Sequence, residues 1–281
     1  MSRLKTLVFF SVDDLFLRNE WAGDITVVSS KEIEPEEDLK ILDLLEDFDT
    51  PSTLFIPGKI AELFPAKLKE VATRGFEVAA HGYRHENLCL LKEAERKKRV
   101  LKSVNLLEKC IGKEVLGWRS PGLHIDDSLY KILKETRVKW CSNIELPLHF
   151  RSVPLTYGGK MELPIASVDL KLYQKGFNPA KVCDIWLSAL KKGNEIFTIV
   201  IHPWVQLNSA DRLHGLKLFL ELATSRENVE FCMGSAIYRQ CISQPHSTYG
   251  SMLSATARLW KQFSKQAQAP LSMAQKVFSQ Y

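Results

Sequence analysis

The chain has 281 residues, of which 45% are hydrophobic and 25% are charged. This composition supplies enough apolar material for a large core and excludes a disordered or fibrous protein. The formal net charge is +5, but residues 245–281 carry four cations and no acidic residue. The rest of the chain is therefore close to neutral, and we expect no nucleic-acid partner.

The first residues, MSRLKTLVFFSVDD, contain an apolar run from Thr6 to Val12. Two aspartates follow this run and no small-residue cleavage site is present, so we predict a strand here and not a signal peptide. No later run reaches the ~20 apolar residues that a membrane-spanning helix needs. Six cysteines are scattered without a C-x-x-C pair, which indicates reduced core residues and favours a cytoplasmic location.

Short apolar runs alternate with longer amphipathic runs along the whole chain. The apolar runs predict strands at residues 4–12, 52–56, 76–80, 115–119, 138–142, 161–164, 196–201 and 229–233. The amphipathic runs predict helices at residues 35–47, 60–74, 92–111, 128–136, 179–192 and 211–225. This alternation is typical of βα units around a parallel sheet, so we predict one α/β barrel or one large open sheet.

Two long segments interrupt the alternation, at residues 17–35 and 143–160. Loops of that length usually cover a functional site or are mobile. Polar side chains also follow the carboxyl ends of several predicted strands: Asp13 and Asp14, His81 and His85, Arg119, and His202. Because the carboxyl ends of parallel strands meet on one face of a barrel, we expect these side chains to share one site.

The spacing of His81 and His85 is common by chance, and a single histidine is most often a structural or surface residue. With a carboxylate from another strand end, however, two imidazoles form an open site for a divalent ion. Asp13 and Asp14 could cap a helix or a turn. They directly follow the apolar run LVFFSV, where buried carboxylates need a cation nearby, and a metal together with Arg119 would supply it.

Two further residues have alternative interpretations at this stage. Arg119, in GWRSPG, is either a surface arginine before a proline turn or the partner of a buried carboxylate. His202 ends the run FTIVIH, where a histidine is either a core residue with its hydrogen bonds satisfied or an acid–base group.

The segments SVDD, HGYRH, RSPG and IVIHP occur in an order and at a spacing that resemble the polysaccharide deacetylase (NodB-homology) domain, carbohydrate esterase family four. The similarity extends over about residues 4–235. The resemblance implies a distorted (β/α)7-type barrel of parallel strands that binds one divalent metal, usually zinc. We therefore expect a barrel domain at residues 1–243, followed by a C-terminal helical extension at residues 244–281.

The resemblance also assigns roles to residues. It implies that Asp14, His81 and His85 bind the metal and that Asp13 is the catalytic base. Arg119 would hold Asp13, and His202 would be the general acid. In the implied reaction, water attacks an amide carbonyl, a backbone N–H near Gly122 stabilises the oxyanion, and the departing amine receives a proton.

The implied substrate is an N-acetylated sugar in a polysaccharide or a lipid-linked glycan, because IVIHPW and MELPIAS resemble a subgroup associated with such glycans. Alternatives are an allantoinase-like hydrolase of a small amide and an inactive glycan-binding relative. The complete set of acid, base and metal-ligand residues argues against the inactive relative. Predicted substrate contacts are Pro121, Gly122, Tyr83 and Trp204, and the aromatic residues Trp21, Trp118 and Tyr157 could also line the site or belong to the core.

The sequence departs from the family pattern at several positions. Leu15 stands where glycine is common, Gly82 replaces a serine or threonine between the histidines, and Val200 replaces a leucine. The fourth family motif, with an aspartate and a tryptophan, has no clear counterpart. Asp169 is therefore the candidate for orienting His202, and the departures put the substrate in doubt more than metal binding.

The C-terminal segment 253–267 has the pattern of a basic amphipathic helix. On a helical wheel, apolar side chains share one side and cations the neighbouring side: Leu253, Ala257, Leu259, Trp260, Phe263 and Ala267, then Arg258, Lys261 and Lys265. We expect the apolar stripe to pack on the barrel or on a second copy of the chain. The alternative is contact with an anionic membrane surface, which would place the protein peripherally at the inner face of the membrane.

Overall fold

The computed structural model describes residues 5–17, 35–146, 148, 154–191 and 196–243. The predicted helix at 253–267, the predicted tail domain at 244–281, and Trp21 lie outside the described residues. The helices and strands up to residue 133 are β1 (Thr6–Asp13), α1 (Pro35–Asp47), β2 (Thr53–Ile56), α2 (Ile60–Leu63), α3 (Pro65–Thr73), β3 (Glu77–Ala80), η3 (Leu88–Leu90), α4 (Glu93–Ile111), β4 (Gly117–Trp118), η4 (Pro121–Leu123) and α5 (Asp127–Leu133). They are followed by β5 (Trp140–Cys141), β6 (Leu155–Tyr157), β7 (Lys160–Glu162), β8 (Ser167–Val168), α6 (Asp169–Gln174), α7 (Pro179–Lys191), β9 (Ile196–Ile201), α8 (Pro203–Gln206), α9 (Ala210–Thr224), β10 (Val229–Cys232) and α10 (Gly234–Ser243).

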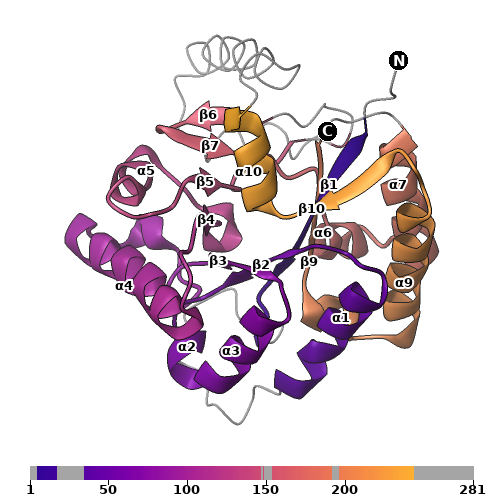
Figure 1. Cartoon of the computed structure of the whole chain (residues 1–281), viewed down its shortest axis with the longest axis horizontal. Helices are drawn as coiled ribbons and strands as arrows, with labels where there is room; N and C mark the ends of the chain where they lie inside the picture. The colour runs from indigo at the N-terminus through magenta and orange to yellow at the C-terminus, as the bar shows by residue number, and fades with distance from the viewer. Residues whose placement is uncertain (1–4, 18–34, 147, 149–153, 192–195, 244–281) are drawn as a thin grey trace.

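One ten-stranded sheet forms the centre of the molecule, in the order β6-β7-β5-β4-β3-β2-β1-β9-β8, with β10 paired to β1. Among the described residues, every strand pair is parallel except β6 with β7. The sheet curls into a half-barrel, and helices lie around its outside (Figure 1). The predicted α/β fold, a distorted barrel of mainly parallel strands, is confirmed.

Strand β1 is the centre of the sheet. All eight of its residues are buried, as expected for a parallel strand that is covered on both faces. It pairs with β9 from Leu7 to Val12, while β10 pairs with its first half and β2 with its last three residues. The end of β1 is thus held between β2 and β9, which fixes the position of Asp13.

The interior of the half-barrel is filled by Trp140, whose ring lies edge-on to Phe9 and Phe55 at centroid distances of 5.6 and 5.8 Å. Gly234, the first residue of α10, lies against the same ring, where a Cβ atom would approach to 2.4 Å. The Gly234 amide donates to Thr53 Oγ1 at 3.0 Å, at the start of β2. Helix α10 therefore covers the amino ends of the strands and leaves the carboxyl ends to the polar residues.

Several elements differ from the sequence-based expectation. The helix predicted at residues 60–74 is divided into α2 and α3, because Pro65 begins a new helix and disfavours helical backbone in the residue before it. The long connection at 143–160 contains the short strand β6. The sequence patterns also failed to predict β8, α6, α8 and α10, of which the first is two residues long.

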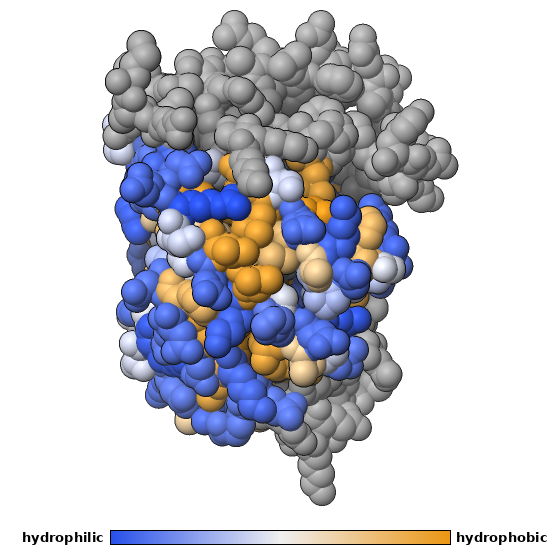
Figure 2. Space-filling view, turned by 90° about the vertical axis from the view of Figure 1, so that its right-hand side faces the viewer, coloured by the Kyte–Doolittle hydropathy of each residue, from blue (hydrophilic) through white to orange (hydrophobic). Residues whose placement is uncertain are grey.

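Figure 2 shows the face formed by α7 and α9, where apolar side chains lie among hydrophilic ones. Leu218 and Leu222 of α9 are exposed there.

None of the helices in the part of the chain that the structure describes combines the length and apolar character needed to cross a bilayer. All six cysteines are free thiols.

Candidate active site

The polar residues predicted from strand ends come together at the carboxyl edge of the sheet. Asp13 is the last residue of β1, and His81 and His202 directly follow β3 and β9. Arg119 directly follows β4. The strands β4, β3, β2, β1 and β9 are neighbours in that order, so the sheet brings together side chains that are up to 189 residues apart in the sequence.

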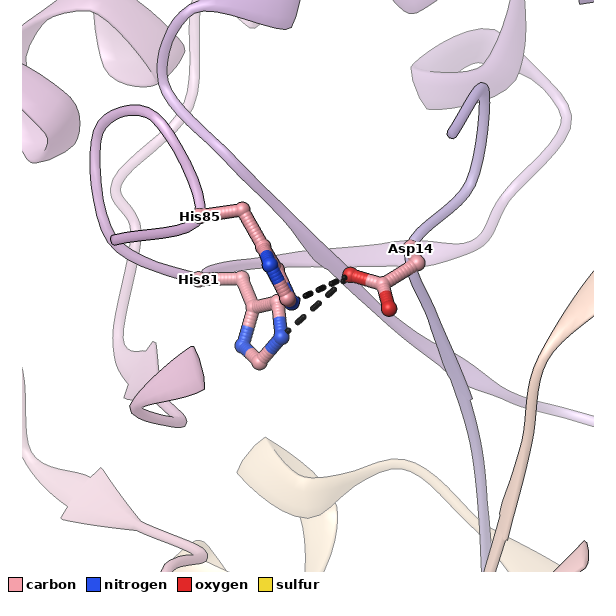
Figure 3. A group of neighbouring side chains, drawn as sticks. All are labelled: Asp14, His81 and His85. Atoms are coloured by element: carbon pink, nitrogen blue, oxygen red, sulfur yellow. Dashed lines mark ion pairs between the residues drawn. The ribbon is translucent and has the colours of Figure 1, made fainter. Parts of the chain in front are cut away.

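Asp14, His81 and His85 form a compact group in which one ligand atom from each residue lies within 4.8 Å of the others. Asp14 Oδ1 is 3.0 Å from His85 Nε2 and 3.4 Å from His81 Nε2. Figure 3 shows the two imidazoles, from the loop after β3, pointing toward the carboxylate at the end of β1. The structure therefore places one carboxylate and two imidazole nitrogens around one point.

The backbone at this group is unusual. Asp14 and His85 have φ angles of 61° and 59°, a left-handed region that costs a non-glycine residue about 1–3 kcal/mol. The turn after Asp14 is held by a hydrogen bond from Leu17 N to Asp14 O at 2.9 Å and by Phe16 N, which donates to Asp38 of α1 at 2.5 Å. These contacts fix the turn that carries Asp14.

Gly82 explains one departure from the family pattern. Its φ is +69°, and a Cβ atom there would lie 3.0 Å from Pro121 Cγ. Glycine is therefore suited to this position, since a serine or threonine would be strained by the backbone and crowded by the neighbouring turn.

The tautomer of His81 prepares this group for a cation. His81 Nδ1 lies 2.9 Å from the carbonyl oxygen of Arg119, which can only accept, so Nδ1 carries the proton and the Nε2 lone pair faces Asp14. Burial lowers the pKa of His81 to about 4, so this imidazole is neutral at neutral pH. A lone pair directed at a carboxylate is unfavourable unless a cation lies between them.

The ionisation state of Asp14 also suits a cation ligand. Burial by itself would raise the pKa of Asp14, but the positive charge of neighbouring imidazoles in their protonated form, that of His85 first, holds it well below its ordinary value. Asp14 is therefore ionised at neutral pH. One ionised carboxylate and two imidazoles are a common ligand set for a divalent ion with open positions, and the three residues fit such an ion.

Arg119 is fully buried, which excludes the interpretation as a surface arginine. Its Nη1 donates to Asp13 Oδ1 at 2.5 Å and to Ser11 Oγ at 2.9 Å. Its Nε and Nη2 donate to the carbonyl and the hydroxyl of Ser142 at 2.9 and 2.7 Å. The guanidinium also lies over the ring of Phe55, with Cζ 3.9 Å from the ring centroid. These contacts hold Arg119 in one orientation, with its charge against Asp13.

His202 forms the second charged pair of the site. Its Nδ1 lies 2.7 Å from Oδ1 of Asp169, which is fully buried. Asp169 Oδ2 accepts hydrogen bonds from His202 N at 2.9 Å and from Gln206 Nε2 at 2.7 Å. Burial opposes the charge of the imidazolium, but Asp169, and then Asp14 and Asp13, raise the pKa of His202 to about 9.

The orientation of His202 follows from these bonds. The Nδ1 proton is directed at Asp169, and Nε2 is 3.9 Å from Asp14 Oδ2. The ring of Trp204 lies beside it, with centroids 5.5 Å apart. His202 therefore presents its Nε2 proton to the group formed by Asp14, His81 and His85.

The predicted substrate contacts occupy different environments. Gly122 is exposed, with φ +59°, Pro121 is buried beside it, and Trp204 is half-buried. Tyr83 is 3% exposed, and its hydroxyl donates to Glu62 at 2.9 Å and accepts from Lys102 at 2.6 Å. These bonds tie Tyr83 to α2 and α4, so its contact with substrate stays a prediction that its burial does not favour.

The other aromatic candidates lie in the core or at its border. Trp118 is fully buried, which assigns it to the core. Tyr157 is half-buried, with its ring 4.9 Å from that of Tyr130. His149, a possible alternative acid in the long connection, lies outside the described residues.

Three residues of the site were not predicted from the sequence: Ser11, Ser142 and Gln206. Ser11, a partner of Arg119, lies two residues before Asp13, and the twofold period of a strand places both on one face. Gln206, a partner of Asp169, lies four residues after His202 in a helical turn. Both spacings were readable signals once Asp13 and His202 had been chosen.

Comparisons with known proteins find deacetylase relatives over part of the chain. The polysaccharide deacetylase family model matches residues 27–140, a range that includes His81, His85 and Arg119. The chain is 35% identical over 82 residues to a peptidoglycan deacetylase of Helicobacter pylori, which is 29% of this chain and 28% of that protein. It is 30% identical over 103 residues to a peptidoglycan-N-acetylglucosamine deacetylase of Bacillus cereus, which is 37% of this chain and 34% of that protein. The chain thus matches about a third of the length of these curated relatives.

Solved structures share the fold over most of the chain. A Mycobacterium smegmatis protein assigned as a polysaccharide deacetylase superposes with a TM-score of 0.69 and 21% identity, covering 87% of this chain and 93% of that one. The PuuE allantoinase superposes with a TM-score of 0.68 and 19% identity, covering 89% of this chain and 93% of that one. At these identities the superpositions establish the fold and leave the substrate open.

Proposed function

We propose that this chain, which belongs to the polysaccharide deacetylase family, is a metal-dependent hydrolase that removes an acetyl group from the amide nitrogen of an amino sugar in a glycan. The observation that carries the proposal is the placement of two charged pairs beside one ligand group. Asp13 with Arg119, and His202 with Asp169, both adjoin the group of Asp14, His81 and His85.

A divalent ion held by Asp14, His81 and His85 would supply Lewis-acid activation of the attacking water and of the amide carbonyl. Asp13, held by Arg119 through Oδ1, takes the proton of the attacking water as the new C–O bond forms. The backbone N–H at the exposed Gly122 is the proposed hydrogen-bond donor to the developing oxyanion.

The C–N bond then breaks, and the nitrogen takes a proton. An amide anion is a very poor leaving group, so a general acid is required. His202 meets this requirement, because Asp169 keeps the imidazole protonated and directs Nε2 toward the ligand group. The products are acetate and the free amino sugar.

The substrate class is supported by the curated relatives, whose names describe deacetylases of peptidoglycan and of its N-acetylglucosamine. The proposal extends to a polysaccharide or a lipid-linked glycan as carrier of the sugar. A cytoplasmic location, with or without contact at the inner face of the membrane, remains a proposal that rests on the cysteine content and the pattern of residues 253–267. Zinc is the proposed ion, on the basis of the donor set.

The experiment that tests the function is a measurement of acetate release by the metal-loaded protein from N-acetylglucosamine oligomers, peptidoglycan and lipid-linked N-acetylated sugars, with allantoin as a small amide. We expect acetate release from at least one glycan. Turnover of allantoin with no acetate release would favour the small-amide hydrolase, and glycan binding without turnover would favour an inactive relative.

A further inference from the structure

Glu162, at the end of β7, is a buried carboxylate that the proposed reaction does not use. Its side chain is fully buried, and Oε1 accepts hydrogen bonds from the hydroxyl of Tyr130 and from Asn143 Nδ2. Oε2 accepts from the backbone N–H of Asn143 at 2.9 Å. An ionised carboxylate is costly to bury, so its presence in the interior needs an explanation.

The explanation lies in what Glu162 does to Asn143, which is itself 1% exposed. Both donors of Asn143, the backbone N–H and the side-chain Nδ2, bond to Glu162 at 2.9 Å. The side-chain oxygen Oδ1 must therefore face the other way, where it accepts the N–H of Ser120 at 2.7 Å. Glu162 thus fixes the orientation of an amide group that could otherwise rotate by half a turn.

Ser120 lies between the two functional parts of one turn. Arg119, before it, holds Asp13, and Gly122, two residues after it, carries the proposed oxyanion donor. Ser142, the neighbour of Asn143, accepts hydrogen bonds from Nε and Nη2 of Arg119. Residues 142–143 therefore clamp this turn at its backbone and at the side chain of Arg119.

We propose that Glu162 is a positioning residue for the reaction, acting through Asn143 on residues 119–122. This inference rests on the proposed function and adds a residue to its machinery. The hydrogen bonds of Glu162 in the described part of the chain go to Tyr130 and Asn143, and its negative charge also favours the charged guanidinium of Arg119. Through Asn143 it holds Arg119 and the amide of Gly122 in the geometry that the reaction needs.

The test exchanges hydrogen-bonding groups and leaves the shape nearly unchanged. Glu162→Gln places an NH₂ group against the donors of Asn143 or against the hydroxyl of Tyr130, which breaks the alignment of the amide. Asn143→Asp sets a second carboxylate against Glu162. The double variant Glu162→Gln, Asn143→Asp reverses the bond between the two side chains, because the new amide donates to the new carboxylate. The backbone N–H of residue 143 still has an acceptor in the amide oxygen at position 162, and the N–H of Ser120 still has one in the new carboxylate.

Glu77 supplies the matched control. It is a half-buried carboxylate whose pKa is raised because desolvation disfavours its charge, and it accepts from a hydroxyl, Thr53 Oγ1, at 2.8 Å and from a backbone amide, Ser235 N, at 3.1 Å. It lies at the amino end of β3, away from His81. Glu77→Gln therefore disturbs a carboxylate with similar hydrogen-bond donors at the opposite edge of the sheet.

Two measurements read the outcome on the metal-loaded full chain. The first is amide hydrogen exchange at Ser120, which needs no substrate. We expect faster exchange in Glu162→Gln, exchange at the wild-type rate in Glu77→Gln, and recovery in the double variant. The second is acetate release, for which we expect kcat to fall about 10- to 100-fold in Glu162→Gln, with KM and metal content unchanged, and to recover in the double variant.

The inference is wrong if Glu162→Gln matches Glu77→Gln in both measurements, or if the double variant restores neither. Should Glu162→Gln not fold, Tyr130→Phe removes one donor to Glu162 and is expected to give a smaller change in the same direction; no change at Ser120 in that variant would overturn the inference. A wild-type protein that binds metal and releases no acetate would refute the proposed function, while the exchange rates at Ser120 would still decide the role of Glu162.

Discussion

Asp169→Asn is the sharpest perturbation of the proposed general acid. In the protein, the pKa of His202 is about 9, compared with an ordinary value of about 6.5. A tenfold change in proton affinity corresponds to about 1.4 kcal/mol. The surrounding carboxylates therefore outweigh the effect of burial, and the net preference for the imidazolium is about 3 kcal/mol. Asp169 is the largest of these favourable contributions.

Asparagine at position 169 cannot reproduce the hydrogen bonds of the carboxylate. If its NH₂ group takes the place of Oδ2, it faces two donors, His202 N and Gln206 Nε2. If it takes the place of Oδ1, it faces Nδ1 of His202, which must then give up its proton. Burial remains in both cases, so the pKa of His202 should fall to about 6.5 or lower.

The assay is the pH dependence of kcat/KM for acetate release by metal-saturated enzyme. Because the raised pKa keeps His202 protonated until the pH rises through it, activity should be lost on the alkaline side, and Asp169→Asn should move that limb to lower pH. At about pH 7.5 the protonated fraction would fall to about a tenth, with a similar fall in kcat/KM. A cation bound by Asp14 lowers the pKa of His202 in the wild type and in Asp169→Asn alike. The measured quantity is therefore the difference between the two proteins in the pH of the alkaline limb.

An alkaline limb that stays in place in Asp169→Asn would mean that His202 is not the general acid. The limb would then belong to another group, and the general acid would have to be sought elsewhere, for example at His124, which is exposed beside Gly122.

Two other predictions concern single residues. Asp13→Asn should retain the metal, because Asp13 is not in the ligand group. Its kcat should fall about 10²- to 10⁴-fold, because the variant lacks the proton acceptor. Metal analysis and kinetics on the same sample check both expectations, and an active variant would mean that another residue is the base. Glu62→Gln should lower stability by about 1 kcal/mol at neutral pH. Burial by itself would raise the pKa of Glu62, but hydrogen bonds from Lys59, Lys102 and Tyr83 lower it to about 2. The stabilisation by the ionised carboxylate is therefore present above the unfolded-state pKa and disappears as the pH falls through the folded-state pKa. Urea unfolding of both proteins should therefore show a smaller difference at about pH 3 than at neutral pH, and an equal difference at both would contradict the assignment.

Much of the fold was predictable because long parallel strands leave a plain signal. The run Thr6 to Val12 is apolar throughout and became the central strand, and the polar residues after each such run met because parallel strands end at one edge. This reasoning located Asp14, His81 and His202 from three distant parts of the sequence.

Other features had weak signals. Asp169 follows β8, a strand of two residues, and no periodicity can be read from so short an element. Glu162 and Asn143 become connected only through pairing of β7 with β5, a contact between segments that the sequence separates by a long connection. The break at Pro65, in contrast, could have been predicted from the proline alone.

The proposed function requires that Asp14, His81 and His85 bind a divalent ion on which acetate release depends. The most direct measurement is the metal content of the purified protein, made together with acetate release, for the wild type, for Asp13→Asn and for the double variant His81→Ala, His85→Ala. We expect about one ion per chain in the wild type and in Asp13→Asn, and neither ion nor activity in the double histidine variant. Full metal occupancy in the double histidine variant would contradict this expectation.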